Sequence, residues 1–177
     1  MATQPQYVAD FLDTVAADNL FQTLRLAPDV WQQETFKIFG KRVRVPRMVA
    51  WFGEEGINYR YTGLDHTARG WPNSLAQVRQ QVATEFSFNA NFALLNYYRN
   101  GEDYVGWHRD NETATTRIVS LSLGAARRFR LRREDEGSHE LVLQHGSALA
   151  FDGAVRHCLP KSSPSIAPRI NITFRRI

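Results

Sequence analysis

A histidine and an aspartate stand two residues apart in His108-Arg109-Asp110. On an extended segment, residues i and i+2 project to the same face, so both side chains can reach one metal ion. One more histidine would complete a set of two imidazoles and one carboxylate, which leaves coordination positions open at Fe(II). Chance alone supplies roughly a quarter of a His-x-Asp motif in a chain of this composition, so the motif needs support from elsewhere.

The candidates for a third ligand are His66, His139, His145 and His157. His139 lies beside an acidic run and His145 precedes a glycine, so we expect each to be an ordinary solvated or turn histidine. His66 stands upstream in an irregular segment. His157 begins a short apolar run just before the last strand-like segment, and we expect it to complete the metal site.

The C-terminal segment 169–175 alternates between polar and apolar residues. In a strand, this period of two places Arg169, Asn171, Thr173 and Arg175 on one face. Two guanidinium groups beside an amide and a hydroxyl can bind a dicarboxylate through charge-assisted hydrogen bonds. The alternative is an amphipathic strand with its polar face in water, which would not need this combination of groups. We therefore expect this strand to bind an anionic ligand.

Short strands must position these side chains. From residue 91 onward, runs of β-forming residues alternate with turn signals such as Asn100-Gly101 and Asp152-Gly153. The pattern predicts strands over 92–98, 104–108, 117–123, 128–132, 140–143, 147–151, 156–159 and 169–175. This many short strands predict a mainly β fold with flanking helices (α+β), as a double-sheet jelly roll or a barrel.

Two helices are expected ahead of these strands. The first follows from apolar residues at roughly helical spacing before Pro28, namely Phe11, Val15, Leu20, Phe21 and Leu24. The second follows Pro72, with Leu75, Val78, Val82 and Phe86 on one face. Between them, residues 36–63 are rich in glycine, aromatic and basic residues, which favours short strands joined by loops.

Composition sets broad limits on the function. The amino-acid composition does not change abruptly along the 177 residues, so we expect one domain and, by default, a monomer. There is no signal-peptide pattern and no apolar run of membrane-spanning length. The single cysteine, Cys158, favours an intracellular protein, cytoplasmic in a bacterium or nuclear in a eukaryote. The net charge of +4 comes from 19 arginines and 3 lysines, which either codon usage or a phosphate-bearing partner could explain.

Three motifs, taken in order, resemble the AlkB family of Fe(II)- and 2-oxoglutarate-dependent dioxygenases. They are Asn96-Tyr97-Tyr98, His108-Arg109-Asp110-Asn111-Glu112 with the later His157, and Pro168-Arg169-Ile170-Asn171-Ile172-Thr173-Phe174-Arg175. The resemblance implies a double-stranded β-helix, which is a jelly roll. It implies Fe(II) bound by His108, Asp110 and His157, with O2 as oxidant. It also implies a 2-oxoglutarate site formed by Asn96, Tyr98, Arg169, Asn171, Thr173 and Arg175, in which Arg169 with Tyr98 takes the distal carboxylate.

The upstream segment resembles the branch that repairs double-stranded DNA. Ile38-Phe39-Gly40-Lys41 is similar to a finger hairpin whose aromatic residue enters the duplex in place of a flipped base. A core position for Phe39 is the alternative. The basic residues Lys41, Arg42, Arg44 and Arg47 would then lie where phosphates pass.

The resemblance also implies residues around the flipped base. Tyr61 would stack on the damaged base, and Tyr59 would form a wall of its pocket. Glu112 would act near the target base as a catalytic or substrate-binding carboxylate, and an exposed turn residue is the alternative. Tyr61 stands where a phenylalanine would suit the duplex-repair branch, and the turn at 134–137 is short and acidic.

These observations predict a single dioxygenase domain over 1–177. It would consist of a helical N-terminal extension to about residue 35, a nucleotide-recognition lid over about 36–70, and a helix plus jelly-roll core over about 71–177. The reaction that the resemblance implies is oxidative demethylation of N-alkylated bases such as 1-methyladenine or 3-methylcytosine in DNA, with double-stranded DNA as the expected partner and single-stranded DNA as the alternative. Alternatives with the same chemistry are an RNA or tRNA demethylase and a protein or small-molecule hydroxylase. A non-catalytic nucleic-acid-binding module is a further alternative, which the intact ligand set opposes.

Overall fold

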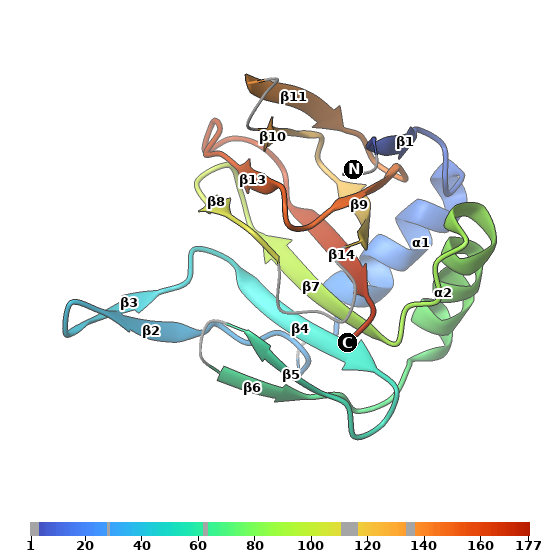
Figure 1. Ribbon diagram of the computed structural model, residues 1–177, viewed down its shortest axis with the longest axis horizontal. Coiled ribbons are helices and arrows are strands. Elements are labelled where there is room, and N and C mark those ends of the chain that lie inside the picture. The colour runs from blue at the N-terminus through green and yellow to red at the C-terminus, as the bar shows by residue number, and fades with distance from the viewer. Residues whose placement is uncertain (1–3, 28, 62–63, 111–116, 134–136) are drawn as a thin grey trace.

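The computed structural model describes residues 4–27, 29–61, 64–110, 117–133 and 137–177, in which two antiparallel sheets face each other (Figure 1). The larger sheet has the order β1 (Gln6–Val8), β12 (Ala148–Asp152), β9 (Arg117–Gly124), β14 (Arg169–Arg175), β7 (Phe92–Tyr98), β4 (Met48–Gly53). The smaller sheet has the order β11 (Gly137–Leu143), β10 (Arg127–Arg133), β13 (Arg156–Leu159), β8 (Val105–His108). This is the predicted jelly roll, and the eight predicted strands are all present.

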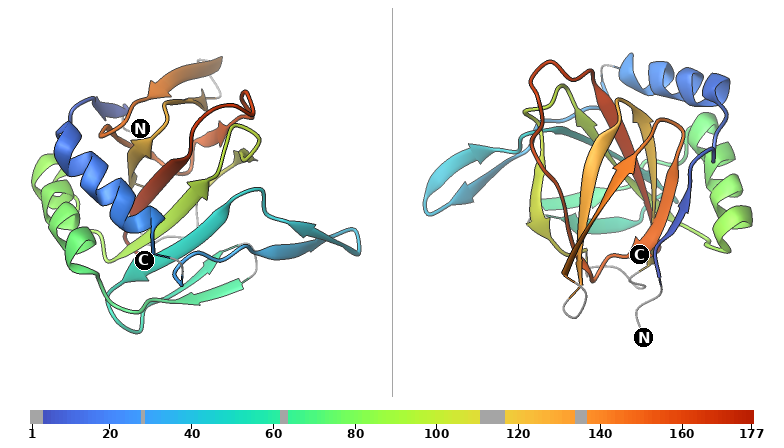
Figure 2. Two further views of the ribbon diagram at one scale, coloured as in Figure 1. Left: turned by 180° about the vertical axis from the view of Figure 1, so that it is seen from behind. Right: turned by 90° about the horizontal axis from the view of Figure 1, so that it is seen from above.

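Two helices cover the outer face of the larger sheet (Figure 2). In α1 (Thr14–Arg25) the Asp13 side chain accepts a hydrogen bond from the Ala16 amide at 2.8 Å and so caps the helix. In α2 (Asn73–Phe86) the buried residues are the four that the spacing predicts. The prediction for α1 is wrong at Val15, which is 70% exposed, because Ala17 lies on the buried face with Leu20, Phe21 and Leu24. No helix in the described ranges has the length and apolarity to span a membrane.

The two faces of β14 meet different surroundings, as the alternation predicts. Ile170, Ile172 and Phe174 pack into the core between the larger sheet and the helices. Arg169, Asn171, Thr173 and Arg175 lie on the opposite face, toward the smaller sheet, and all four are buried. The polar face is therefore the wall of an internal pocket and not a solvent-exposed surface.

Two hairpins extend the fold beyond the sheets. One is formed by β2 (Thr35–Ile38) and β3 (Lys41–Arg44), and it projects away from the body of the molecule (Figure 1). Phe39 and Gly40 form its tip with positive φ angles of 48° and 79°. The other is formed by β5 (Asn58–Tyr61) and β6 (Leu64–Thr67). Between them, β4 pairs with β7 and joins the larger sheet, so the segment 36–70 is partly built into the core.

The N-terminal segment is less purely helical than its sequence indicates. β1 pairs with β12 and forms one edge of the larger sheet before α1 begins. A strand of three residues carries too little periodicity to be recognised locally, since its stability depends on a partner more than 130 residues away in sequence.

Candidate active site

Two neighbouring strands of the smaller sheet bring three potential metal ligands together. His108 ends β8 and His157 lies opposite it in β13, while Asp110 follows two residues after His108. The ligand atoms of the three residues lie within 4.8 Å of one another. His108 Nε2 is 3.8 Å from Asp110 Oδ1, and His157 Nε2 is 3.4 Å from Asp110 Oδ2. This is the constellation that the sequence predicts.

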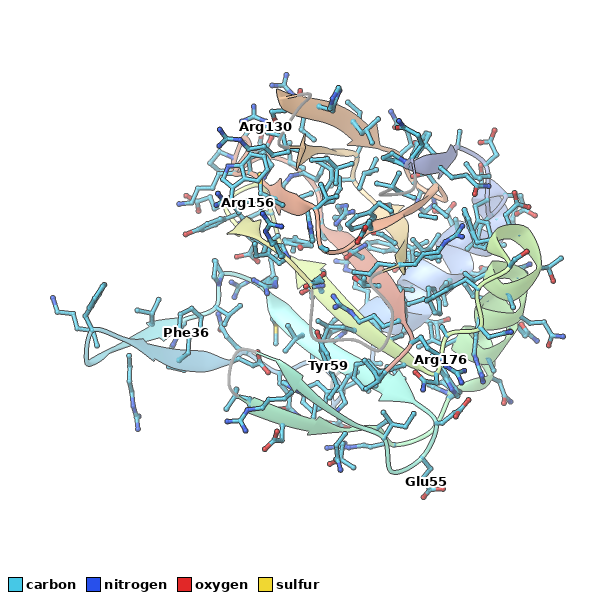
Figure 3. The ribbon with its side chains drawn as sticks, viewed as in Figure 1. Phe36, Glu55, Tyr59, Arg130, Arg156 and Arg176 are labelled. Carbon is cyan, nitrogen blue, oxygen red and sulfur yellow. The ribbon has the colours of Figure 1, made fainter. Side chains whose placement is uncertain are left out.

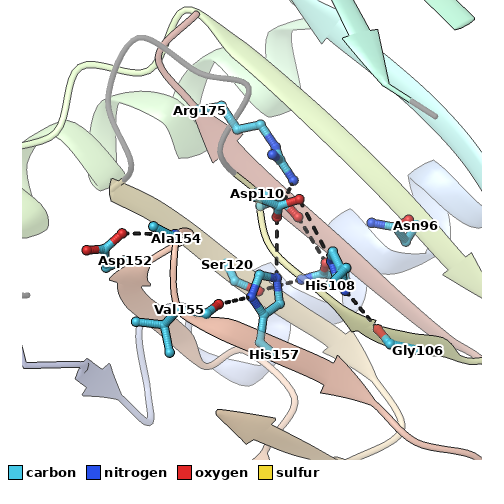
Figure 4. A network of polar contacts seen from close by, with 12 residues as sticks. Asn96, Gly106, His108, Asp110, Ser120, Asp152, Ala154, Val155, His157 and Arg175 are labelled. Atoms are coloured by element: carbon cyan, nitrogen blue, oxygen red, sulfur yellow. Dashed lines mark hydrogen bonds and ion pairs between the residues drawn. The ribbon is translucent and has the colours of Figure 1, made fainter. Parts of the chain in front are cut away.

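Backbone carbonyl groups fix both imidazole rings in the same tautomer (Figure 4). Nδ1 of His108 lies 2.8 Å from the Gly106 carbonyl oxygen, and Nδ1 of His157 lies 2.8 Å from the Val155 carbonyl oxygen. A carbonyl oxygen only accepts, so each Nδ1 donates a proton to it. Each Nε2 then keeps its lone pair on the side of Asp110, as a metal ligand requires.

Asp110 is held as a carboxylate in an almost fully buried position. Burial alone would raise its pKa, but the Arg175 guanidinium at 2.8 Å holds the pKa well below its usual range. Its backbone amide donates to the Gly153 carbonyl at 2.7 Å. A Cβ atom at Gly153 would stand 2.7 Å from the Asp110 carbonyl oxygen, so this close approach requires glycine.

The imidazole of His108 is kept neutral. Its burial and the adjacent His157 lower its pKa to about 4, against the opposing effect of Asp110. A neutral imidazole and an ionised carboxylate are the protonation states in which these groups coordinate a divalent metal.

Beside the triad, a polar pocket lies between the two sheets. Arg169 donates to Ser122 Oγ at 2.9 Å, and its guanidinium carbon lies 5.4 Å from the centre of the Tyr98 ring. Asn171 donates to Ser120 Oγ at 2.6 Å and accepts from Thr173 Oγ1 at 3.1 Å. These contacts fix the polar groups of β14 before any ligand arrives. Ser120 and Ser122 were not anticipated, although serines at alternate positions of an apolar strand are the signal that could have identified them.

The residues present fit a metal ion and an anionic cosubstrate. Among the described residues, Asp110 Oδ1 and Arg169 Nε are buried polar atoms without a hydrogen-bond partner. Asp110 Oδ1 is an acceptor at the triad and is complementary to a cation. Arg169 Nε is a cationic donor in the pocket and is complementary to a carboxylate. Burial lowers the pKa of Arg169 to about 10, which still leaves it charged at neutral pH.

A series of contacts joins the triad to the hairpins. Arg175 Nη1 donates to the Tyr59 hydroxyl at 3.0 Å, and the backbone of Tyr59 pairs with that of His66 across the β5–β6 hairpin. His66 Nδ1 lies 3.2 Å from the Tyr59 carbonyl oxygen, and His66 Nε2 lies 2.5 Å from Glu34 Oε1. Glu34 immediately precedes β2. Sequence reasoning missed this buried pair, since neither residue carries a local signal of the other.

The other histidines are not part of the triad. His145 accepts from the Gly124 amide and lies 3.2 Å from Asp18, so it is the turn residue that the sequence predicts. His139 lies in β11, and its side chain is exposed. The side chain of His66 instead contacts Glu34.

The residues expected to contact substrate differ in their exposure to solvent, and some lie outside the described part of the chain. Phe39 is fully exposed at the tip of the β2–β3 hairpin, which excludes a core position. Tyr59 is 1% exposed and points inward (Figure 3). The side chain of Tyr61 and the whole of Glu112 lie outside the part of the chain that is described.

Arg47 requires a correction. It was expected among the phosphate-facing residues, but it is buried, and its Nε donates to Asn96 Oδ1 at 2.7 Å. Arg47 lies between β3 and β4, where the chain turns back toward the core, and its guanidinium therefore lines the polar pocket. Lys41, Arg42 and Arg44 remain exposed on the hairpin.

Comparison with known proteins identifies relatives over nearly the whole chain. The model of the 2OG-Fe(II) oxygenase superfamily matches residues 4–175. DNA oxidative demethylase ALKBH2 of Bos taurus is 35% identical over 91% of this chain, and the chain spans 64% of that protein's length. ALKBH2 of Mus musculus is 34% identical, with 91% of this chain and 75% of that protein covered. The alkB homolog 3 dioxygenase of Bos taurus is 35% identical over 94% of this chain and 64% of its own length.

Solved structures share the fold at low sequence identity. OsALKBH1 superimposes with a TM-score of 0.68 at 16% identity, with 97% of each chain covered. A Pseudomonas putida prolyl-4-hydroxylase gives a TM-score of 0.63 at 16% identity, with 97% of this chain and 92% of the other covered. At this identity the similarity concerns the jelly roll alone.

Proposed function

The chain belongs to the 2OG-Fe(II) oxygenase superfamily and, within it, to the AlkB family, whose cofactors are Fe(II), 2-oxoglutarate and O2; from this premise we propose that it is a DNA oxidative demethylase. The proposed substrates are bases with an N-methyl group on the pairing edge, such as 1-methyladenine and 3-methylcytosine. The methyl group is hydroxylated while 2-oxoglutarate and O2 give succinate and CO2. The resulting hemiaminal then releases formaldehyde and restores the base.

His108, Asp110 and His157 are the proposed ligands of Fe(II). When bound, the metal with 2-oxoglutarate and O2 would supply the oxidising power for insertion of an oxygen atom into a C–H bond. The protein orients the ligand atoms through the Gly106 and Val155 carbonyls, and Arg175 keeps Asp110 ionised. The hydrogen bonds are made in the free protein, so the site does not have to reorganise when the metal enters.

The polar face of β14 is the proposed site of 2-oxoglutarate. Arg169 binds the distal carboxylate beside Tyr98, and Arg175 with Asn171 lies toward the metal. Asn96 and Thr173 complete the proposed set. Support for this orientation comes from Arg175, which is the β14 guanidinium in contact with the metal carboxylate, whereas Arg169 lies six residues along the strand.

The segment 36–70 is the proposed nucleotide-recognition lid of a single dioxygenase domain. Phe39 is proposed to occupy the space that a flipped base leaves in the duplex, with Lys41, Arg42 and Arg44 near phosphates. Tyr59 forms a wall of the base pocket, Tyr61 stacks on the base, and Glu112 lies near its reacting edge. Arg47 is proposed to support Asn96 from within the pocket.

The observation that carries this proposal is the combination of the His-Asp-His group with ALKBH2 relatives over 91% of the chain. A protein or small-molecule hydroxylase would have the same triad, but it would leave the exposed Phe39 and the adjacent basic residues without a purpose. An RNA demethylase remains the second candidate. It needs stacking surfaces but no wedge.

The test measures formaldehyde and repaired base from oligonucleotides that carry one 1-methyladenine. Matched duplex DNA, single-stranded DNA and single-stranded RNA are compared in the presence of Fe(II), 2-oxoglutarate and O2. We expect turnover that requires all three and disappears in His108→Ala. Succinate formation without any repaired base would retain the iron chemistry and reject the nucleic-acid substrate.

A further inference from the structure

A surface groove lies next to the polar pocket, between the β2–β3 hairpin and β8. It encloses about 410 Å³, and its aromatic side chains are Phe36, Tyr104 and Trp107. Arg47 and His108 line both this groove and the polar pocket. A polymer whose reacting unit lies at the metal site, next to His108, can therefore place its next unit in the groove.

The groove presents aromatic surface that the fold leaves uncovered. Trp107 is 39% exposed, although it directly precedes a residue of the triad. Phe36 pairs with Val43 across the hairpin, so both side chains share the face that turns toward the groove. The Tyr104 amide donates to the Pro46 carbonyl at 3.1 Å, which holds this wall against the lid. Figure 3 shows Phe36 on the projecting hairpin.

The groove also carries positive charge. Arg109 lines it, and its Nη1 donates to the Ala154 carbonyl at 2.9 Å. Lys161 Nζ lies 5.2 Å from the centre of the Tyr104 ring. Flat aromatic rings beside cationic groups are complementary to a nucleobase attached to a phosphate, because the base stacks and the phosphate is neutralised. An acidic peptide would use the charges but not the ring faces, and an aliphatic peptide would leave the charges unused.

We propose that Trp107, with Tyr104 and Phe36, forms a stacking subsite for the base that directly neighbours the damaged base on the same strand. The inference rests on the proposed function, since it assigns the adjoining nucleotide to the groove when the damaged base lies in the base pocket at the metal site. It adds a specificity determinant outside the base pocket: repair depends on a stackable neighbour on one side of the lesion.

Binding tests the subsite directly. Single-stranded oligonucleotides carry 1-methyladenine with the fluorescent base 2-aminopurine on its 5′ side or its 3′ side. The protein is loaded with Mn(II) and 2-oxoglutarate, so that the complex forms without turnover. We expect quenching of 2-aminopurine on one side only, retained in Trp107→Phe and lost in Trp107→Leu.

A matched control is Tyr7→Leu, which removes an aromatic ring of similar exposure (37%) from the far edge of the larger sheet. It should quench as the unchanged protein does. Quenching on neither side, or quenching that persists in Trp107→Leu, would overturn the subsite.

Turnover separates this inference from the proposed function. Trp107→Leu should lower kcat/KM for an oligonucleotide about tenfold, the loss expected for one stacked base. With an abasic neighbour on the sensitive side, the variant and the unchanged protein should be equal. Repair that is unaffected by Trp107→Leu and by the abasic neighbour would reject the subsite and leave the proposed demethylase activity standing. Trp107-dependent quenching without any repair rejects the demethylase and keeps the subsite.

Discussion

Arg169 is a buried cation whose charge the protein only partly compensates. Its exposed fraction is 2%, burial lowers its pKa, and Arg127 adds like charge. A buried guanidinium with an unsatisfied Nε is costly for the free protein, and the cost is recovered when a carboxylate binds. At the scale of single residues, the buried charge of Arg169 favours binding of a carboxylate and destabilises the protein that has no ligand.

Arg169→Met follows from this argument. We expect KM for 2-oxoglutarate to rise at least tenfold, because a charge-assisted pair contributes roughly 1.5–3 kcal/mol. Without 2-oxoglutarate, the free energy of unfolding should be unchanged or higher than in the unchanged protein. Steady-state kinetics and urea unfolding measure the two effects. A variant that unfolds more easily but keeps its KM would assign Arg169 a purely structural role.

The Glu34–His66 pair gives stability a pH dependence. Burial opposes protonation of His66, but the hydrogen bond and charge of Glu34, with the backbone of Tyr59 and Leu64, raise its pKa above 6.5. Because the folded pKa exceeds the unfolded one, the stabilisation is complete below about pH 6.5 and is lost as the pH rises through the folded pKa.

Glu34→Gln removes the charge and keeps the shape. We expect it to cost about 2 kcal/mol below about pH 6.5, the scale of a hydrogen bond to a charged group, and progressively less as the pH rises through the folded pKa. Urea unfolding across this range measures the difference. The control is Glu55→Gln, since Glu55 is exposed at a turn and points away from the body of the molecule (Figure 3). A cost that stays constant with pH would show that His66 is not protonated in the pair.

At the scale of elements, the β2–β3 hairpin is the element that we propose to distinguish duplex from single-strand repair. Its tip holds Phe39 fully exposed with φ at 48°, a conformation that costs energy in a non-glycine residue and keeps the ring in solvent. Phe39→Ala should lower kcat/KM on duplex DNA about tenfold or more, since flipping a base costs a few kcal/mol. Repair of single strands should stay within about twofold. Leu26→Ala, at an exposed site after α1, is the control, and equal losses on both substrates would reject a wedge.

Elements with strong local periodicity were predictable from the sequence, and contacts between distant segments were not. The four apolar positions of α2 and the two faces of β14 agree with the structure because each depends on neighbours within one element. Within the triad, His108 and Asp110 were found because they stand two residues apart, whereas the distant His157 was selected from four candidate histidines because it begins a strand-like run. The Glu34–His66 pair and β1 were missed because both depend on partners far along the chain. Arg47 was misplaced because a basic run does not reveal where the chain turns inward.

At the scale of the whole molecule, the metal site connects the two halves of the jelly roll. His108 and His157 belong to the smaller sheet, while Arg175, which contacts Asp110, belongs to the larger one. A metal that binds only the folded arrangement stabilises it by mass action, by about 2.7 kcal/mol at a hundredfold excess over its Kd. For a domain of this size, that corresponds to a rise in Tm of roughly 5–10 °C.

Thermal unfolding with Mn(II) tests this connection independently of catalysis. We expect the rise in Tm for the unchanged protein, its reversal by EDTA, and its absence in His157→Ala. His139→Ala is the matched control, because it removes an exposed histidine from the smaller sheet outside the triad, and its Tm should still respond to the metal. Since Asp110 also pairs with Arg175 between the sheets, Asp110→Asn should lower Tm without metal as well as abolish the rise. A His157→Ala protein that Mn(II) still stabilises would place the metal elsewhere.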